Sequence, residues 1–274
     1  MKATAKSENC FDTDASRYAA YLETPMGRLR ADLVFANLQE LLPSWRDLSS
    51  LRALDLGCGT GATAARLARL GIQVTLLDSS TAMLARAQRT VDEAGLSDNV
   101  TLKLGDAARL DGIFPPASFD LIVCHNLLEF ADEPAAVLRA AARLMRDSSS
   151  LLSVFVRNQA GEILKAALQT GDLGAAEQAM TADWGEESLY GGKVRLFTPL
   201  ALESLLHEAS LTSKAQRGVR VVADYLPVKI SPSVDYDRVF AFEHKLGQRR
   251  EFLGVARYLH CLASLSTPAS KEGA

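Results

Sequence analysis

The amino-acid sequence predicts an α/β fold in which a mostly parallel sheet carries helices on both faces. Short apolar blocks alternate with amphipathic helical patterns between residues 50 and 157, which is typical of strands joined by helical crossovers. A glycine-rich stretch, LDLGCGTGA at 54–62, connects the first apolar block to the first helical pattern. With 274 residues and 48% hydrophobic content, the chain can bury one large core of this kind.

Five strands and three helices are expected in this core. Short apolar runs predict strands at 51–57, 72–78, 100–105, 119–125 and 151–156. Between them, apolar residues three and four positions apart predict helices with one buried face at 61–70, 81–95 and 134–145. Each helix is short enough for a right-handed crossover between parallel strands.

The remaining regions flank the core. In the N-terminal segment, 1–49, an amphipathic helix at 27–43 closes with a proline and is expected over the carboxyl edge of the sheet. Weak helical stretches and a Gly-Gly interruption indicate a cap insertion at 158–195. The C-terminal region, 196–265, is expected to hold a helix at 198–211 and two late strands at 219–226 and 255–265, followed by a polar tail at 266–274.

The composition argues against several other classes of protein. The N-terminus lacks the apolar stretch of a secretory signal, and the longest apolar runs are far below the roughly 20 residues that span a bilayer. We therefore expect a cytoplasmic protein with no membrane partner. Neither the cysteine spacing nor a His/Asp cluster offers a metal site, so reduced thiols and no bound metal are expected at Cys10, Cys58, Cys124 and Cys261.

The glycine-rich stretch predicts a nucleotide-binding loop. It follows an expected strand and begins an expected helix. An acidic residue, Asp78, stands at the end of the next strand, 21 positions beyond Gly57. Asp78 is placed to accept hydrogen bonds from both hydroxyls of a ribose. The loop alone fits either NAD or S-adenosylmethionine. Asp55 favours the second, because a carboxylate suits an ammonium group better than a pyrophosphate.

Four segments resemble the consecutive motifs of the class I S-adenosylmethionine-dependent methyltransferases: LDLGCGTGA at 54–62, LLDSS at 76–80, GDA at 105–107 and FDLIVCHNLLEF at 119–130. The resemblance implies a Rossmann-like seven-stranded sheet whose last strand is antiparallel, with S-adenosyl-L-methionine as cofactor. Members of this family usually carry a Pro-Gly-Gly turn before the fifth strand. Here Asp147 and the serines at 148–150 take its place, and their side chains can form a turn by hydrogen bonding.

A narrower resemblance lies outside the shared core. ETPMGRLRADL at 23–33, CHNLLEF at 124–130, RGVRVVADYL at 217–226 and RYLH at 257–260 are similar to bacterial tRNA methyltransferases that esterify the carboxylate of 5-carboxymethoxyuridine (uridine 5-oxyacetic acid) at the wobble position. This implies the tRNA anticodon region as partner, with segment 1–49 over the donor site. It also implies that Arg30 binds the donor carboxylate, that Gly57 and its neighbours Cys58, Gly59 and Gly61 line its methionine, that Asp78 takes its ribose, and that Asp106, Ala107 and His125 complete the pocket.

Each of these residues also has a purely structural interpretation. The glycines can simply make a turn, Asp78 can cap the following helix, and Asp106 can be a turn residue. His125 can be hydrogen-bonded to backbone, and Arg30 can be a solvated charge or a surface ion pair. Tyr18 and Tyr21 can pack half-buried or close over the donor.

The chemistry of the acceptor sets a further expectation. A carboxylate is already ionised at neutral pH, because its reference pKa is roughly 4, so no general base is required. Cations must instead position it, and Arg157, Arg195 and Arg220 are the candidates. Between residues 193 and 250 there are ten Lys and Arg against six Asp and Glu in a chain of net charge −3, which is compatible with a phosphate-bearing partner.

Three functions remain open on the sequence. The first is a tRNA wobble-uridine carboxyl methyltransferase. A small-molecule methyltransferase acting on a metabolite carboxylate, hydroxyl or amine is the second, and a non-catalytic S-adenosylmethionine-binding module is the third. The sequence contains four histidines and no evident catalytic dyad.

Overall fold

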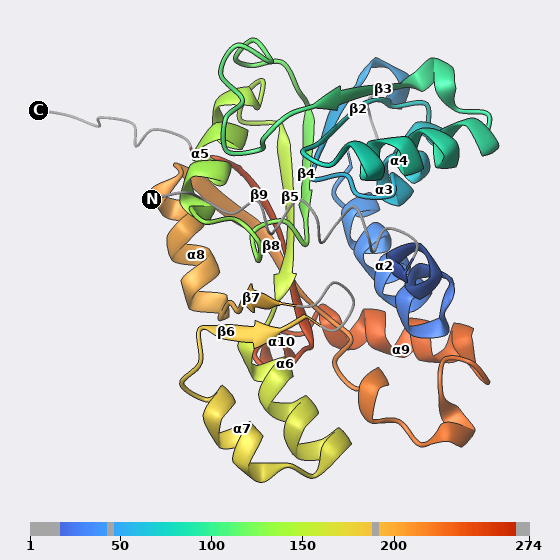
Figure 1. The fold of residues 1–274 in the computed structure, drawn as a ribbon, viewed down its shortest axis with the longest axis vertical. Coiled ribbons are helices and arrows are strands. Elements are labelled where there is room, and N and C mark those ends of the chain that lie inside the picture. The colour runs from blue at the N-terminus through green and yellow to red at the C-terminus, as the bar shows by residue number, and fades with distance from the viewer. Residues whose placement is uncertain (1–16, 43–46, 188–191, 267–274) are drawn as a thin grey trace, which may run out of the picture.

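A seven-stranded sheet forms the centre of the computed structural model, which describes residues 17–42, 47–187 and 192–266 (Figure 1). The strand order is β3-β2-β1-β4-β5-β9-β8. Its members are β1 (Arg52–Leu56), β2 (Gln73–Asp78), β3 (Val100–Leu104), β4 (Leu121–His125), β5 (Leu151–Arg157), β8 (Leu211–Val219) and β9 (Tyr258–Leu265). Because β9 runs antiparallel to both β5 and β8, the expected seven-stranded sheet with an antiparallel last strand is confirmed.

Helices cover both faces of the sheet (Figure 1). On one face, α5 (Pro134–Leu144) and α8 (Pro199–Glu208) bury Val137, Leu138 and Leu202 against apolar residues of β1, β4 and β5. On the other, α3 (Ala62–Arg69) and α4 (Thr81–Glu93) bury Leu67 and Ala87 against β1 and β2. The alternating strands and helices expected between residues 50 and 157 are confirmed.

The N-terminal helix packs beside a helix from the C-terminal region. α2 (Pro25–Gln39) and α9 (Tyr236–Gly247) share an apolar cluster in which Leu29, Leu33 and Val239 meet Phe155 and Tyr258 of the sheet. Thr24 caps α2 by accepting a hydrogen bond from the backbone N–H of Gly27. The short helix α10 (Arg250–Leu253) then leads into β9. This arrangement holds Arg30 of α2 close to the carboxyl ends of the strands.

The segment expected as a cap insertion folds into small elements of its own. It contains α6 (Gln159–Leu164), a π-helical stretch (Lys165–Thr170) and α7 (Leu173–Ala179). Two short antiparallel strands follow, β6 (Trp184–Glu186) and β7 (Lys193–Arg195). They form a separate sheet beside the end of β5 (Figure 1).

The expected strand at 219–226 is wrong. β8 ends at Val219, and Arg220 adopts a left-handed conformation with φ of 58°. The backbone N–H groups of Val221, Val222 and Ala223 then all donate hydrogen bonds to the buried carboxyl of Glu243 in α9. The chain therefore curls into a 3₁₀ turn (Ala223–Tyr225) after Val219 instead of continuing as a strand.

Several smaller expectations can be compared with the structure. The turn before β5 forms as expected, because the backbone N–H and hydroxyl of Ser149 both donate hydrogen bonds to Asp147 Oδ1, at 2.8 Å and 2.6 Å. The cysteines at 58, 124 and 261 are buried free thiols, whereas Cys10 and the tail from 267 onward lie outside the described residues. Among the helices of the described ranges, none is long and apolar enough to cross a membrane.

Candidate active site

A large cavity opens at the carboxyl edge of β1, β2, β4 and β5. Its volume is about 1600 Å³, and α2 and the β6–β7 hairpin contribute to its wall. The sequence-predicted donor-site residues that line it are Arg30, Asp55, Gly57, Cys58, Gly59, Asp78, Asp106, Ala107 and His125. Such an edge is where open α/β sheets bind their ligands.

Two glycines of the loop have different roles, one in the cavity wall and one in the packing of α3 against α4. Gly57 has a φ of 66°, and a Cβ at this position would lie 2.8 Å from the side chain of Leu127. Gly61 has a φ of 75° at the start of α3, where a Cβ would lie 3.0 Å from the Cβ of Ala87. Gly57 therefore borders the cavity, whereas Gly61 is absent from the described wall and allows α3 to pack closely against α4.

Asp78 organises the loop from the neighbouring strand. Its Oδ2 accepts a hydrogen bond from the backbone N–H of Gly59, and its Oδ1 accepts one from that of Ser80, both at 2.9 Å. The N-cap of α4 is Ser80, whose hydroxyl accepts from the backbone N–H of Met83. Asp78 thus fixes the glycine loop and also accepts from the N–H of Ser80, the N-cap residue of α4.

Asp55 lies deeper in the same wall. It is buried at the end of β1, and burial together with the nearby charge of Asp78 raises the pKa of its carboxyl to about 8. In such an environment the ionised form is disfavoured unless a positive charge is brought close. Asp55 is therefore suited to meet a cationic group of a ligand.

Asp106 is the most exposed of these carboxylates. Its Oδ1 accepts a hydrogen bond from the backbone N–H of Ala108 at 2.9 Å, as in an Asx turn, and its side chain is 56% exposed. Ala107, beside it, is buried in the main core cluster. Asp106 forms the turn that was its structural interpretation, and the residue also lines the cavity.

His125 belongs to a buried chain of side-chain contacts. Its Nε2 lies 2.8 Å from Ser153 Oγ, which lies 2.8 Å from Nε2 of His260. Asn37 in α2 completes the chain at 3.4 Å from the other ring nitrogen of His260. Burial, with a smaller contribution from the charge of Arg30, lowers the pKa of His125 to about 3. The imidazole is therefore neutral around pH 7.

Arg30 is a buried cation. Only 6% of it is exposed, its guanidinium donates a hydrogen bond to the Tyr18 hydroxyl at 3.0 Å, and it lies 4.8 Å from the ring centre of Tyr21. Within the described ranges it forms no ion pair with a carboxylate. Since a buried charge without a counterion is costly, this site favours a bound anion.

Two of the three expected acceptor arginines are placed elsewhere. Arg220, left-handed after β8, donates hydrogen bonds to Asp224 and to the Tyr21 hydroxyl, and Arg195 lies over the ring of Trp184 at 4.7 Å. Neither belongs to the described cavity wall. The expectation that Arg220 faces the acceptor from a strand is therefore wrong, because it rested on the strand predicted at 219–226.

Arg157 does line the cavity, but it is already paired. Its guanidinium contacts Glu162 at 3.4 Å and forms a close ion pair with Glu187. A further wall residue, Glu129, received no role from the sequence, although it stands within the quoted segment 119–130. Only the turn after β4 brings it back to the cavity, so local patterning gave no reason to select it.

Comparison with known proteins agrees with this geometry. A family model described as a methyltransferase domain matches residues 53–148. The chain is 27% identical to tRNA 5-carboxymethoxyuridine methyltransferase of Escherichia coli (strain K12), over 96% of this chain and 97% of that protein. Residues 53–148 are therefore a methyltransferase domain, and the protein is an S-adenosylmethionine-dependent methyltransferase. The expected enzyme class and the expected cofactor, S-adenosyl-L-methionine, are confirmed.

Other relatives of this methyltransferase match less of its length or only its fold. It is 33% identical to ubiquinone biosynthesis O-methyltransferase of Paracidovorax citrulli (strain AAC00-1), over 51% of this chain and 61% of that protein. The structure of magnesium protoporphyrin IX methyltransferase from Synechocystis PCC 6803 superposes with a TM-score of 0.64 at 16% identity, covering 95% of this chain and 98% of that one. In the described part of the methyltransferase, no cluster of His, Cys, Asp and Glu is suited to hold a metal ion.

Proposed function

We propose that this methyltransferase converts the carboxylate of 5-carboxymethoxyuridine, at the wobble position of tRNA, into its methyl ester. The observation that carries the proposal is the similarity to the tRNA enzyme of Escherichia coli, which extends over 96% of the chain and so includes the cap and the C-terminal region. Acceptor specificity is expected in those regions, since the donor-binding core is common to methyltransferases with many different acceptors.

The donor-site residues fit S-adenosylmethionine in three places. Arg30 is a buried cation suited to the donor carboxylate, Asp55 is a buried acid suited to its ammonium group, and Asp78 faces the cavity where two ribose hydroxyls would donate to it. Gly57 lines the cavity, and its positive φ together with a Cβ position only 2.8 Å from Leu127 favours glycine there. Asp106, Ala107 and His125 complete the pocket.

The wall of the cavity also suits an acceptor that is already ionised. S-adenosylmethionine supplies a methyl group on a positive sulfonium, and transfer to a carboxylate oxygen neutralises both charges as the C–S bond breaks and the O–C bond forms. His125, the only histidine in the described wall, has a pKa of about 3 and is in addition hydrogen-bonded to Ser153. It is poorly suited to act as a general base near pH 7, and a carboxylate needs none.

The size of the cavity supports a second occupant beside the donor. Its volume of about 1600 Å³ exceeds the range of roughly 300–1000 Å³ that is typical of pockets for one small ligand. Room for a nucleoside next to the donor is consistent with an extruded wobble base, as in other enzymes that modify bases.

The decisive experiment incubates the protein with bulk tRNA and methyl-labelled S-adenosylmethionine. We expect label in tRNA that mild alkali releases, because an ester is hydrolysed whereas an N-methyl or ether group is not. An unmodified transcript of the same tRNA, which lacks the carboxymethoxy group, serves as the matched control and should remain unlabelled. Absence of label from tRNA known to carry the acceptor would refute the proposal.

A small-molecule methyltransferase is the second candidate. It is favoured by the similarity to the ubiquinone biosynthesis enzyme, which is higher in identity, at 33%, but covers only 51% of the chain. If tRNA remains unlabelled, methyl transfer to low-molecular-weight carboxylic acids and phenols in the same assay would support this alternative.

A further inference from the structure

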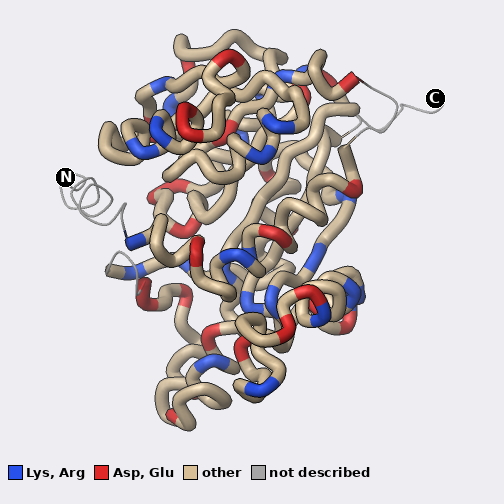
Figure 2. The backbone as a smooth tube through the Cα atoms, turned by 90° about the vertical axis from the view of Figure 1, so that its right-hand side faces the viewer, with Lys and Arg blue, Asp and Glu red and all other residues tan. Residues whose placement is uncertain are grey.

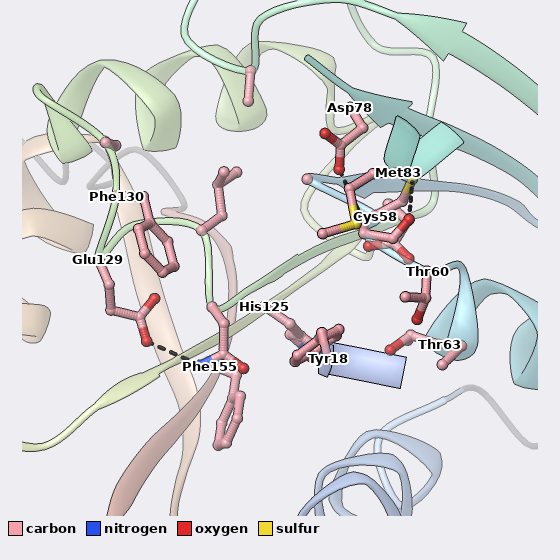
Figure 3. A pocket seen from close by; sticks show the side chains of 18 of the residues that line it. Tyr18, Cys58, Thr60, Thr63, Asp78, Met83, His125, Glu129, Phe130 and Phe155 are labelled. Carbon is pink, nitrogen blue, oxygen red and sulfur yellow. Dashed lines mark hydrogen bonds between the residues drawn. The ribbon is translucent and has the colours of Figure 1, made fainter. Parts of the chain in front are cut away.

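Glu129 is a buried acid in the cavity wall. It follows β4 in the turn that begins at His125, and only 1% of the residue is exposed. Figure 3 shows its carboxyl group directed into the space between Phe130 and Phe155, on the side of the cavity away from Asp78. If the donor lies along the glycine loop and Asp78, Glu129 faces the region left for the acceptor.

One oxygen of this carboxyl group is fixed by two donors. Glu129 Oε1 accepts hydrogen bonds from the side-chain amide of Asn126 at 2.9 Å and from the backbone N–H of Arg157 at 3.0 Å. Its own carbonyl accepts from the backbone N–H of Arg195 in β7. Asn126 adopts a left-handed conformation, with φ of 51°, which brings its amide back to the carboxyl group. Contacts from three elements therefore hold the orientation of Glu129.

The other oxygen, Oε2, is buried and has no hydrogen-bond partner among the described residues. An unsatisfied buried oxygen is costly, so a polar group of a ligand is expected to complete it. Burial is the main cause that raises the pKa of Glu129, against the opposing effects of Asn126 and of the positive charge of Arg157. Because Oε1 is committed as a double acceptor, a proton held by the neutral carboxyl resides on Oε2.

We propose that Glu129 positions the methyl acceptor through Oε2, its buried carboxyl oxygen without a partner among the described residues: Oε2 and one oxygen of the acceptor carboxylate share a hydrogen bond, with one proton between the two groups. The other acceptor oxygen is then left to receive the methyl group. This inference rests on the proposed carboxylate acceptor. A hydrogen bond from a carboxylic acid to a carboxylate is of the strong, charge-assisted kind, whereas an ionised Glu129 would repel the substrate. The same group therefore attracts a carboxylate only in its neutral form.

Two substitutions at this position give opposite expectations. In Glu129→Gln, the two N–H donors that hold Oε1 require an oxygen there, so the amide NH₂ falls at the place of Oε2 and again donates into the cavity. In Glu129→Ala, the donor is lost. At saturating donor, we expect Ala to lower kcat/KM for tRNA by about 10- to 100-fold, the range of a lost hydrogen bond to a charged group, and Gln to restore most of that loss.

The pH profile separates this role from a structural one. As pH rises, Glu129 ionises and the wild-type rate with tRNA should fall, while the rate of Glu129→Gln should not follow that fall. Calorimetric titration with S-adenosylhomocysteine should give the same donor affinity for both variants, and thermal melting should show whether the Ala variant is folded. Glu208→Gln, which removes an exposed carboxylate at the end of α8, outside the described cavity wall, controls for the change in charge.

The outcomes distinguish this inference from the proposed function. Wild-type protein that fails to label acceptor-bearing tRNA refutes the proposed function without reference to Glu129. Wild-type protein that labels tRNA, combined with a Gln variant as impaired as Ala, overturns the role of Glu129 as a donor, since an accepting carboxylate would then be required. An Ala variant that is folded and fully active also overturns it.

Discussion

At the scale of single residues, we expect the protonation state of Asp55 to couple donor binding to pH. Its carboxyl has a pKa of about 8, raised by burial and by the charge of Asp78. A ligand ammonium beside Asp55 stabilises the ionised form, so binding must release a proton wherever the free protein holds one. Donor affinity should therefore increase with pH below pH 8, and the increase should cease above pH 8.

Calorimetry with S-adenosylhomocysteine between pH 6 and 9 measures this coupling. We expect the affinity to rise by up to about tenfold per pH unit below the pKa, as for a single linked proton. Asp55→Asn should bind more weakly and lose most of this pH dependence. The same pH dependence in wild type and Asp55→Asn would assign the proton to another group.

Asp78 and its neighbour Ser80 offer a matched pair of substitutions. Asp78→Ala removes a charged acceptor that faces the cavity and also holds Gly59, so donor affinity should fall more than tenfold, from a loss of ~1.5–3 kcal/mol. Ser80→Ala removes the N-cap of α4 and should cost about 1 kcal/mol of stability while changing donor affinity little. Equal loss of affinity in both variants would mean that the placement of α4, not the carboxylate, governs binding.

At the scale of elements, patterns that depend on near neighbours were predictable. The core strands are short and mostly apolar, the glycine loop directly follows one of them, and the turn at Asp147 is closed by a hydrogen bond from a residue two positions further along the chain. The helix α9 was not anticipated, because Val239, Glu243 and Gly247 form its buried side and two of these are not apolar. The false strand at 219–226 shows the same limitation, since its end is set by the carboxyl of Glu243 from another element.

Some residues of the site could likewise be predicted from the sequence, and others could not. Asp55, Asp78 and the glycine loop could be found from strand ends, whereas the contact of Ser153 with both His125 and His260 joins strands distant in the sequence. The unsatisfied oxygen of Glu129 depends on the backbone of Arg157, which no sequence pattern reveals.

The turn after β8 can be tested through Arg220. Its ion pair with Asp224 is buried, with both side chains 8% exposed. Arg220→Ala should leave the Asp224 carboxylate buried without its partner and lower the free energy of unfolding by about 3 kcal/mol. Donor affinity should change little. Arg238→Ala is the control, because its pair with Asp235 is largely exposed and should matter by less than about 0.5 kcal/mol. Denaturant unfolding that shows similar small effects for both variants would contradict the structural role of Arg220.

At the scale of the whole molecule, positive and negative residues are mixed along the described chain. Figure 2 shows Lys and Arg interspersed with Asp and Glu along the backbone, and the net charge is −3. Positive residues do reach the cavity, where the exposed side chains of Arg28, at 63%, and Arg109, at 87%, form part of the wall together with Lys193. A tRNA would therefore meet a few local cations, and the overall acidic charge would not attract it from a distance.

This arrangement predicts a shallow salt dependence of tRNA binding. About three phosphate contacts near the cavity would give a slope of roughly −2 in a plot of log affinity against log salt, since each neutralised phosphate of a single strand contributes about −0.7. The measurement is tRNA affinity between 50 and 300 mM salt at constant magnesium, with S-adenosylhomocysteine affinity as the salt-insensitive control. Lys193→Ala should reduce the slope by less than one unit while leaving donor affinity unchanged. A slope near zero would mean that the acceptor brings no phosphates to this surface, as for a small molecule, and a slope several times steeper would require a basic surface beyond the cavity.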